Sequence, residues 1–214
     1  VPTSPESESI ILDILNKEIH TVLVRGDPEV VKLEETFSLA DQLGNRLFYG
    51  GYVTPPPLRI SPQRQNKILV SQGGGNVGMQ LLQAAIQVAA LIPKYQFILA
   101  TGSTTSEEDI DDLQASVLTD NVTVVPFLED FRKHLSTAAL SINMGGDNTL
   151  LDVIATKTPS LAFPYPGNSE QTFRIEKLAK HGWISPLSEQ ELNPEIFKTH
   201  IENALKKYHP HKPI

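Results

Sequence analysis

The sequence contains no cysteine in its 214 residues, which excludes disulfides, thiolate metal ligands and cysteine nucleophiles. It has no dense run of Lys or Arg and its formal net charge is -7, so a nucleic-acid partner is not expected. It also has neither an apolar run long enough to cross a bilayer nor a secretory signal at its start. These absences predict a cytoplasmic protein. Because the first residue is Val1 and not Met, we expect a piece of a longer protein.

Three consecutive prolines at residues 55–57 divide the sequence into two parts. Proline-rich segments form semi-rigid linkers, so we expect a domain boundary here, between residues 1–57 and 58–214. The first part has only two expected strands. Two lone strands would have open edges, so residues 10–53 are a candidate for self-association or for packing on the second part. We expect a loose end at residues 1–9, helices at 10–15 and 33–43, and strands at 20–25 and 46–53.

In the second part, short apolar segments alternate with amphipathic ones. The expected strands are residues 67–71, 96–100, 122–125, 140–143 and 161–163, and the expected helices are residues 79–91, 110–118, 131–139, 171–180 and 195–208. This alternation predicts an α/β fold with a Rossmann-like parallel sheet and helices on both faces. Ligands of such sheets bind beyond the carboxyl ends of the strands, so the loops at those ends are the candidate site.

The loop after the first of these strands is rich in glycine. Gly73, Gly75 and Gly78 form a G-x-G-x-x-G pattern between a strand and a helix, which is the context of a dinucleotide fingerprint. That fingerprint also needs an acid near the end of the second strand, but the first acids there, Glu107 and Glu108, lie well inside the next loop. The sequence therefore argues against a nicotinamide or flavin cofactor. The glycines still leave backbone N–H groups able to face another ligand; a tight turn without a ligand is the alternative.

The loop after the fourth strand has a second glycine turn. Gly145 and Gly146 are followed by residues 147–149, each a plausible N-cap for the apolar helix that comes next. The N–H groups and partial positive charge at such a helix start favour a phosphate. We expect Asp152 in the first helical turn, where its carboxylate could accept hydrogen bonds from ribose. An ordinary corner between a strand and a helix is the alternative.

The loop after the third strand carries apolar side chains at its start. An apolar wall at Phe127 and Leu128, with free backbone groups, could recognise the edge of a flat base. The alternative is a plain helix start, with Glu129 and Asp130 as acids near its positive end.

Three segments together resemble a known family: residues 145–152 (GGDNTLLD), 158–164 (TPSLAFP) and 167–171 (GNSEQ). They are similar to the donor-binding half of glycosyltransferases of the GT-B fold, above all to the family 28 C-terminal domain, which includes a peptidoglycan N-acetylglucosaminyltransferase. The resemblance covers most of residues 67–184, and residues 23–53 look like the chain leaving the N-terminal domain of such enzymes. It implies a C-terminal GT-B domain preceded by a short remnant of the N-terminal domain.

The motifs and the resemblance together imply roles for individual residues. In the family, Thr149 falls near the diphosphate and Asp152 falls where a Glu usually binds the ribose hydroxyls, while the backbone at residues 127–128 pairs with uracil. The nucleotide-binding candidates are Gln72, Gly73, Gly74, Gly75, Phe127, Leu128, Gly145, Gly146, Asn148, Thr149 and Asp152, and the donor-sugar candidates are Glu170 and Gln171. No catalytic base is identified.

The resemblance also implies an activity and partners. The donor would be a UDP-sugar, from which an inverting enzyme transfers a hexosyl or N-acetylhexosaminyl group to a glycan or lipid-linked acceptor held by the missing N-terminal domain. No cofactor and no metal are expected, because GT-B enzymes stabilise the leaving diphosphate with helix N-termini and hydrogen-bond donors. We expect the full-length protein in the cytoplasm or at the membrane surface. The alternatives are a GT-B epimerase or hydrolase, and a non-catalytic nucleotide-binding subunit that needs a separate acceptor-binding partner.

Overall fold

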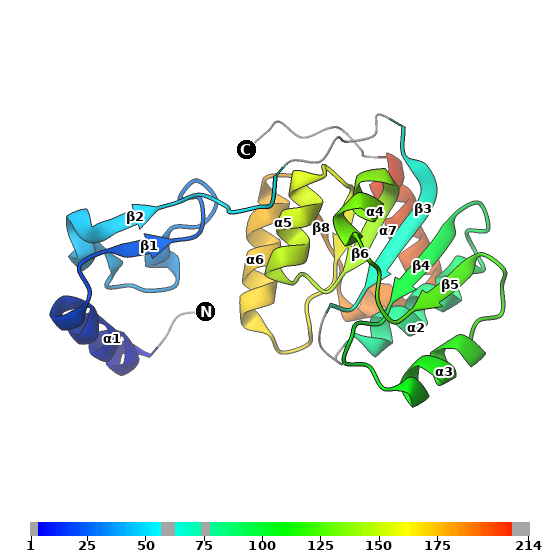
Figure 1. The fold of residues 1–214 in the computed structure, drawn as a ribbon, viewed down its shortest axis with the longest axis horizontal. Coiled ribbons are helices and arrows are strands. Elements are labelled where there is room, and N and C mark those ends of the chain that lie inside the picture. The colour runs from blue at the N-terminus through cyan, green and yellow to red at the C-terminus, as the bar shows by residue number, and fades with distance from the viewer. Residues whose placement is uncertain (1–3, 57–62, 74–77, 207–214) are drawn as a thin grey trace. The chain divides into compact units, whose positions relative to one another are not determined.

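A computed structural model describes residues 4–56, 63–73 and 78–206 of the chain (Figure 1). The chain forms two compact units, Val1–Pro55 and Pro56–Ile214, so the division falls within the proline run. The assignment of the first unit to an acceptor domain stays a prediction. Within the described residues, no helix combines the length and the apolar character that a bilayer span requires.

The first unit contains a helix, two 3₁₀ segments and a two-stranded sheet. Its elements are α1 (Pro5–Glu18), β1 (Val22–Val24), η1 (Leu33–Glu35), η2 (Ala40–Arg46) and β2 (Leu47–Tyr49). The two strands are parallel. The small core of this unit contains Leu12, Phe37, Ala40 and Leu43.

Two expectations for the first unit are wrong. Residues 5–9 are helical and not a loose end, because Ser4 caps α1 by accepting a hydrogen bond from Ser7 N at 3.3 Å and proline begins the helix. The helix expected at 33–43 is replaced by η1 and η2, since Thr36 leaves the helical conformation after the first turn and Gly44 has a φ of 50° within η2. The apolar residues have a helical spacing, but the backbone is not continuously helical across residues 33–43.

The second unit is built on a six-stranded parallel sheet. Its strands are β3 (Gln65–Ser71), β4 (Gln96–Ala100), β5 (Val122–Val125), β6 (Ala138–Asn143), β7 (Ser160–Ala162) and β8 (Ser185–Pro186). Their order across the sheet is β5-β4-β3-β6-β7-β8, and every neighbouring pair is parallel. The strands expected at 96–100 and 122–125 are confirmed, whereas β8 was not expected from the sequence.

Helices cover both faces of this sheet (Figure 1). They are α2 (Met79–Ala89), α3 (Glu107–Ala115), α4 (Phe131–Thr137), α5 (Asp147–Ala155), α6 (Ser169–Lys180), the 3₁₀ segment η3 (Glu189–Leu192) and α7 (Pro194–Lys206). Strand side chains alternate between the faces: Ile68 and Val70 belong to the core that includes α2 and α7, and Leu69 between them is also buried. The expected α/β fold with a doubly covered parallel sheet is thereby confirmed, although Ala138 and Ala139 belong to β6 and not to the preceding helix.

The strand order places the candidate site. From β3 the chain builds the sheet in one direction to β4 and β5, and then continues on the other side with β6 and β7. The connections at the carboxyl ends of β3 and β6 therefore leave in opposite directions and open a crevice between them. The two glycine loops of the sequence follow these two strands.

Candidate functional site

A pocket of about 160 Å³ opens at the carboxyl edge of the sheet. It lies where β3, β4 and β5 end, and it also contacts the first turns of α4 and α5. Its wall is mostly apolar, and the side chain of Phe127 at its mouth is 66% exposed. The lining residues are Ser71, Gly73, Ala100, Gly102, Ser103, Pro126, Phe127, Leu128, Phe131 and Thr149.

Four of the predicted site residues meet in this pocket. Gly73 comes from the loop after β3, Phe127 and Leu128 from the loop after β5, and Thr149 from the first turn of α5. The parallel sheet brings these segments to one edge. The lining residues that the sequence analysis missed are Ser71, Ala100, Gly102, Ser103, Pro126 and Phe131. In the sequence the end of β4 lacks the acid of a dinucleotide fingerprint and carries no other signal. The carboxyl ends of parallel strands nevertheless place the loop after β4 beside the other two loops.

The first glycine loop is only partly described. Gly73 has a φ of 82°, a backbone conformation that favours glycine, whereas Gly74 and Gly75 lie outside the described residues. Gly78 has a packing role of its own, because a Cβ there would lie 2.2 Å from Gln72 Cβ. Gln72 is 2% exposed and donates from Nε2 to Thr105 Oγ1 at 2.7 Å. Gln72 thus belongs to the buried base of this loop and is not among the residues that line the pocket.

The second glycine loop is held by Asn143, the last residue of β6. Asn143 Oδ1 accepts from Gly145 N at 3.0 Å, and its Nδ2 donates to Ser160 Oγ at 2.9 Å. The N-cap of α5 is Gly146, so the expectation that one of residues 147–149 caps the helix is wrong. A glycine cap has no side chain to occupy the N–H groups of the first turn, which leaves them suited to an anionic ligand.

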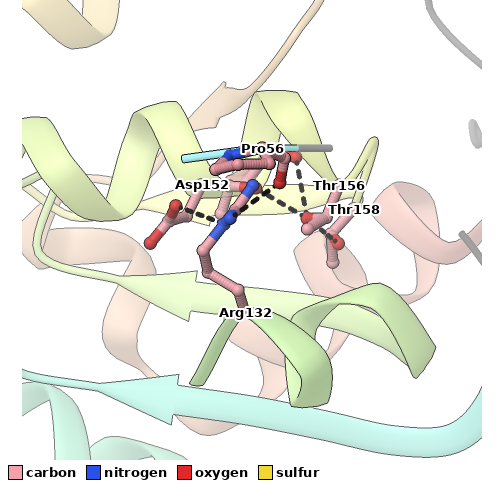
Figure 2. Close-up of polar contacts among 6 residues, drawn as sticks. Pro56, Arg132, Asp152, Thr156 and Thr158 are labelled. Atoms are coloured by element: carbon pink, nitrogen blue, oxygen red, sulfur yellow. Dashed lines mark hydrogen bonds and ion pairs between the residues drawn. The ribbon is translucent and has the colours of Figure 1, made fainter. Parts of the chain in front are cut away.

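Asp152 lies further along α5 than expected. It is the sixth residue of the helix and belongs to the second turn, because α5 begins at Asp147. Its Oδ1 lies 2.9 Å from Nε of Arg132 on α4, and the two side chains are only 20% and 17% exposed (Figure 2). Burial raises the pKa of the Asp152 carboxyl above its ordinary value, and the positive charge of Arg132 opposes that rise.

The two donor-sugar candidates lie in the first turn of α6. The Glu170 carboxylate is paired with the guanidinium of Arg174 one turn later, and Arg174 Nε lies 3.5 Å from Asp147 Oδ1 at the start of α5. Gln171 Oε1 accepts from Tyr165 N at 2.8 Å. Glu170 is thereby linked through Arg174 to the start of α5, where the exposed Asn148 is the second helical residue, whereas Gln171 contacts the loop before α6. The pocket lining does not include Glu170, Gln171 or Asn148.

The family model described as "Glycosyltransferase family 28 C-terminal domain" matches residues 69–212, which is most of the second unit and more than half of the chain. The chain belongs to this family. The resemblance found in the sequence is thereby confirmed.

Two relatives of this family 28 chain carry the same name, UDP-N-acetylglucosamine--N-acetylmuramyl-(pentapeptide) pyrophosphoryl-undecaprenol N-acetylglucosamine transferase. The protein of Clostridium novyi is 26% identical over 139 residues, which are 62% of this chain and 37% of the relative. That of Polaromonas naphthalenivorans is 28% identical over 209 residues, which are 95% of this chain and 57% of the relative. The chain thus spans less than two thirds of the length of either relative.

Solved structures support the fold. The glycotransferase of kitacinnamycin superposes with a TM-score of 0.67 at 14% identity, over 94% of this chain and 53% of the other. At this identity the likeness shows the fold alone. The family 28 chain has the architecture of the C-terminal half of GT-B glycosyltransferases, as the sequence predicted.

The acidic residues that the structure describes do not gather into a cation site. Among the described residues, no three His, Asp or Glu side chains are arranged to hold a metal ion. In the candidate site the acids are instead distributed over two helices, with Asp152 beside Arg132 and both Asp147 and Glu170 beside Arg174. What the site offers a ligand is an apolar pocket, a helix start and a carboxylate one turn beyond it.

Proposed function

We propose that the second unit binds a UDP-sugar and presents its sugar for inverting transfer to an acceptor held elsewhere in the full protein. The group transferred would be a hexosyl or N-acetylhexosaminyl group. The observation that carries the proposal is the pocket at the reversal of strand order, with a glycine loop after β3 and another after β6. Open α/β sheets bind nucleotides at such a crevice.

The pocket itself suits the base. Its small volume and its wall of Pro126, Phe127, Leu128 and Phe131 favour a single flat ring, bound by its faces against apolar side chains. The loop after β5 can offer backbone N–H and C=O groups to the ring edge, and such main-chain contacts would suit uracil. Adenine and guanine are larger and present other donors and acceptors, so they would fit less well.

The start of α5 suits the diphosphate. Thr149 lines the pocket from the third position of this helix, so a nucleotide with its base in the pocket would place its phosphates near the first turn. The N–H groups there and the positive end of the helix stabilise an anion without moving. This would stabilise the UDP that leaves during transfer, with no metal and no cofactor required.

The acceptor would be a glycan or a lipid-linked molecule bound by a preceding domain. This part of the proposal rests on the relatives, whose names state a pyrophosphoryl-undecaprenol acceptor and which are longer than this chain. An enzyme with such an acceptor works at the cytoplasmic membrane surface or near it. Residues 1–57 would then carry the end of the acceptor domain and the linker.

A nucleotide panel tests the donor assignment. We expect UDP to raise the melting temperature of the chain and to bind in calorimetry, with ADP and GDP binding at least about tenfold more weakly, a difference of about 1.4 kcal/mol. The replacement Leu128→Ile should preserve this ranking, because the contact we propose uses the main chain. Equal stabilisation by ADP and UDP would contradict the proposal and favour the dinucleotide interpretation of residues 73–78. Addition of EDTA serves as the control for a metal, and it should leave the affinity for UDP unchanged.

A further inference from the structure

Arg132 and Asp152 form a contact that no sequence pattern predicts. Arg132 belongs to α4 and Asp152 to α5, and Figure 2 shows the arginine side chain reaching from one helix to the other. Arg132 Nε lies 2.9 Å from Asp152 Oδ1. The N–H does not point straight at that oxygen, so the contact is mainly one of charge. Both side chains are largely buried.

The pair lies next to the proposed nucleotide pocket on both helices. Phe131, directly before Arg132, lines the pocket, and so does Thr149, one turn before Asp152 on the same face of α5. A ribose attached to a base in this pocket and to phosphates at the start of α5 would pass close to the Asp152 carboxylate. A carboxylate has two oxygens and about four acceptor positions, so contact with Arg132 at Oδ1 leaves acceptor capacity for hydroxyl groups.

The guanidinium is held at a second point. Arg132 Nη1 donates to the main-chain oxygen of Pro56 at 3.2 Å (Figure 2). The guanidinium is planar and rigid, so two contacts on different nitrogens restrict its orientation. On α5 itself, Thr156 Oγ1 donates to the main-chain oxygen of Asp152 at 2.7 Å, which fixes the backbone there and leaves Arg132 as the contact of the carboxylate. Arg132 is therefore placed to limit the rotation of the Asp152 carboxylate.

Orientation matters more for two hydroxyls than for one. A ribose offers its 2′- and 3′-hydroxyls together, and both can donate to one carboxylate only when its plane faces the diol. A 2′-deoxyribose offers the 3′-hydroxyl alone, which a freely rotating carboxylate can follow. Loss of the group that fixes the carboxylate should therefore weaken the binding of a ribonucleotide more than that of its deoxy analogue.

We propose that Arg132 is a positioning residue, which holds Asp152 toward the ribose diol and so gives the site its preference for ribonucleotides over 2′-deoxyribonucleotides. The inference rests on the proposed nucleotide site. It differs from a plain structural bridge between α4 and α5, because such a bridge would change the affinities for both kinds of nucleotide by the same factor.

The test is calorimetry of the full chain with UDP and 2′-deoxy-UDP. For the unchanged protein we expect UDP to bind about tenfold more tightly, the scale of one hydrogen bond to a charged group. In Arg132→Met this ratio should fall to about twofold or less. Asp152→Asn should lose the ratio as well, because a neutral amide accepts the diol more weakly.

Lys133→Met is the matched control, because Lys133 is the exposed neighbour of Arg132 on α4 and its loss changes the net charge equally. It should keep the ratio of the unchanged protein. If Arg132→Met does not fold, Arg132→Lys replaces it, since lysine keeps the charge without the planar fork. An unchanged ratio in the folded Arg132 variant overturns the inference. Absence of UDP binding to the unchanged protein would instead refute the proposed function.

Discussion

Gly145 occupies a position where both the backbone and a neighbouring side chain require glycine. Its φ is 69°, and a Cβ at this position would lie 2.4 Å from Cδ1 of Ile175 on α6. Ile175 is 1% exposed and has little room to move. Gly146 differs on both counts, because its φ is -65° and a Cβ there would have no heavy atom of the described residues within 4 Å beyond its chain neighbours. Glycine is therefore required at position 145, whereas position 146 has room for a larger side chain.

This difference predicts unequal effects of alanine. Gly145→Ala should lower the free energy of unfolding by about 2–4 kcal/mol, which combines about 1 kcal/mol or more for a left-handed backbone with about 1–3 kcal/mol for overpacking. Gly146→Ala should change it by less than about 1 kcal/mol. Urea unfolding followed by the fluorescence of Trp183, the one tryptophan of the chain, measures both variants. Equal losses in the two variants would contradict this account.

At the scale of single residues, the sequence indicated several residues that line the pocket, but it did not indicate which side chains contact one another. Gly73, Thr149 and the loop at 127–128 could be found because strand ends and glycine turns are local patterns. The pairing of Glu170 with Arg174 also follows from their spacing of four residues on a helix. Arg132 and Asp152 lie on different helices, and nothing in the order of residues indicates that α4 and α5 bring them together.

At the scale of helices, Arg64 connects the carboxyl ends of α4 and α5. Its guanidinium donates to Leu135 O at 2.9 Å, at the end of α4, and to Thr156 O and Lys157 O at 2.8 Å each, at the end of α5. A positive charge there satisfies carbonyl groups that a helix leaves without partners and complements the negative end of both helix dipoles. The other ends of these two helices contact the pocket. Arg64 thus joins the pair of helices that carries the proposed site.

Replacing Arg64 with Met should destabilise the second unit. We expect a loss of about 2–3 kcal/mol in the free energy of unfolding, because several hydrogen bonds from one charged group disappear and the carbonyls of Thr156 and Lys157 lose this donor. Trp183 fluorescence in urea reports on the unit that contains Arg64. Lys180→Met, at an exposed position on α6, is the control and should stay within about 0.5 kcal/mol of the unchanged protein. A loss no larger than in this control would show that Arg64 does not stabilise α4 and α5.

The boundaries of helices and strands could not be predicted from local sequence patterns alone. The strands and helices of the second unit were predictable because several apolar residues repeat with one period in each. The start of α5 was misplaced because Asp147 and Asn148 are better N-cap residues than Gly146, and Thr149 is about as good. This error put Asp152 one turn too early. β8 has only two residues and no period to detect, and its place in the sheet depends on pairing with β7.

At the scale of the whole molecule, the proposed donor site lacks an evident base for transfer. Inverting transfer needs a group that takes the proton of the acceptor hydroxyl and a surface that holds the acceptor in line with the reacting carbon. Asp152 is engaged with Arg132, and Asp147 and Glu170 are engaged with Arg174. No Asp or Glu is among the described residues that line the pocket. No histidine lines the part of the pocket that the structure describes. The relatives, of which the chain matches 37% and 57% of the length, have further residues that could supply both.

We therefore expect this chain alone to bind UDP-sugars without transferring the sugar. The experiment incubates the chain with labelled UDP-sugars and with glycan or lipid-linked acceptors, while calorimetry on the same sample measures donor binding. The expected result is binding without labelled product above the buffer control. Turnover at a rate typical of enzymes, on the order of 1 per second or faster, would show that the base lies within these residues. Asp152→Asn then identifies the source of any product, because activity of this chain should fall with donor affinity and activity of a contaminant should not.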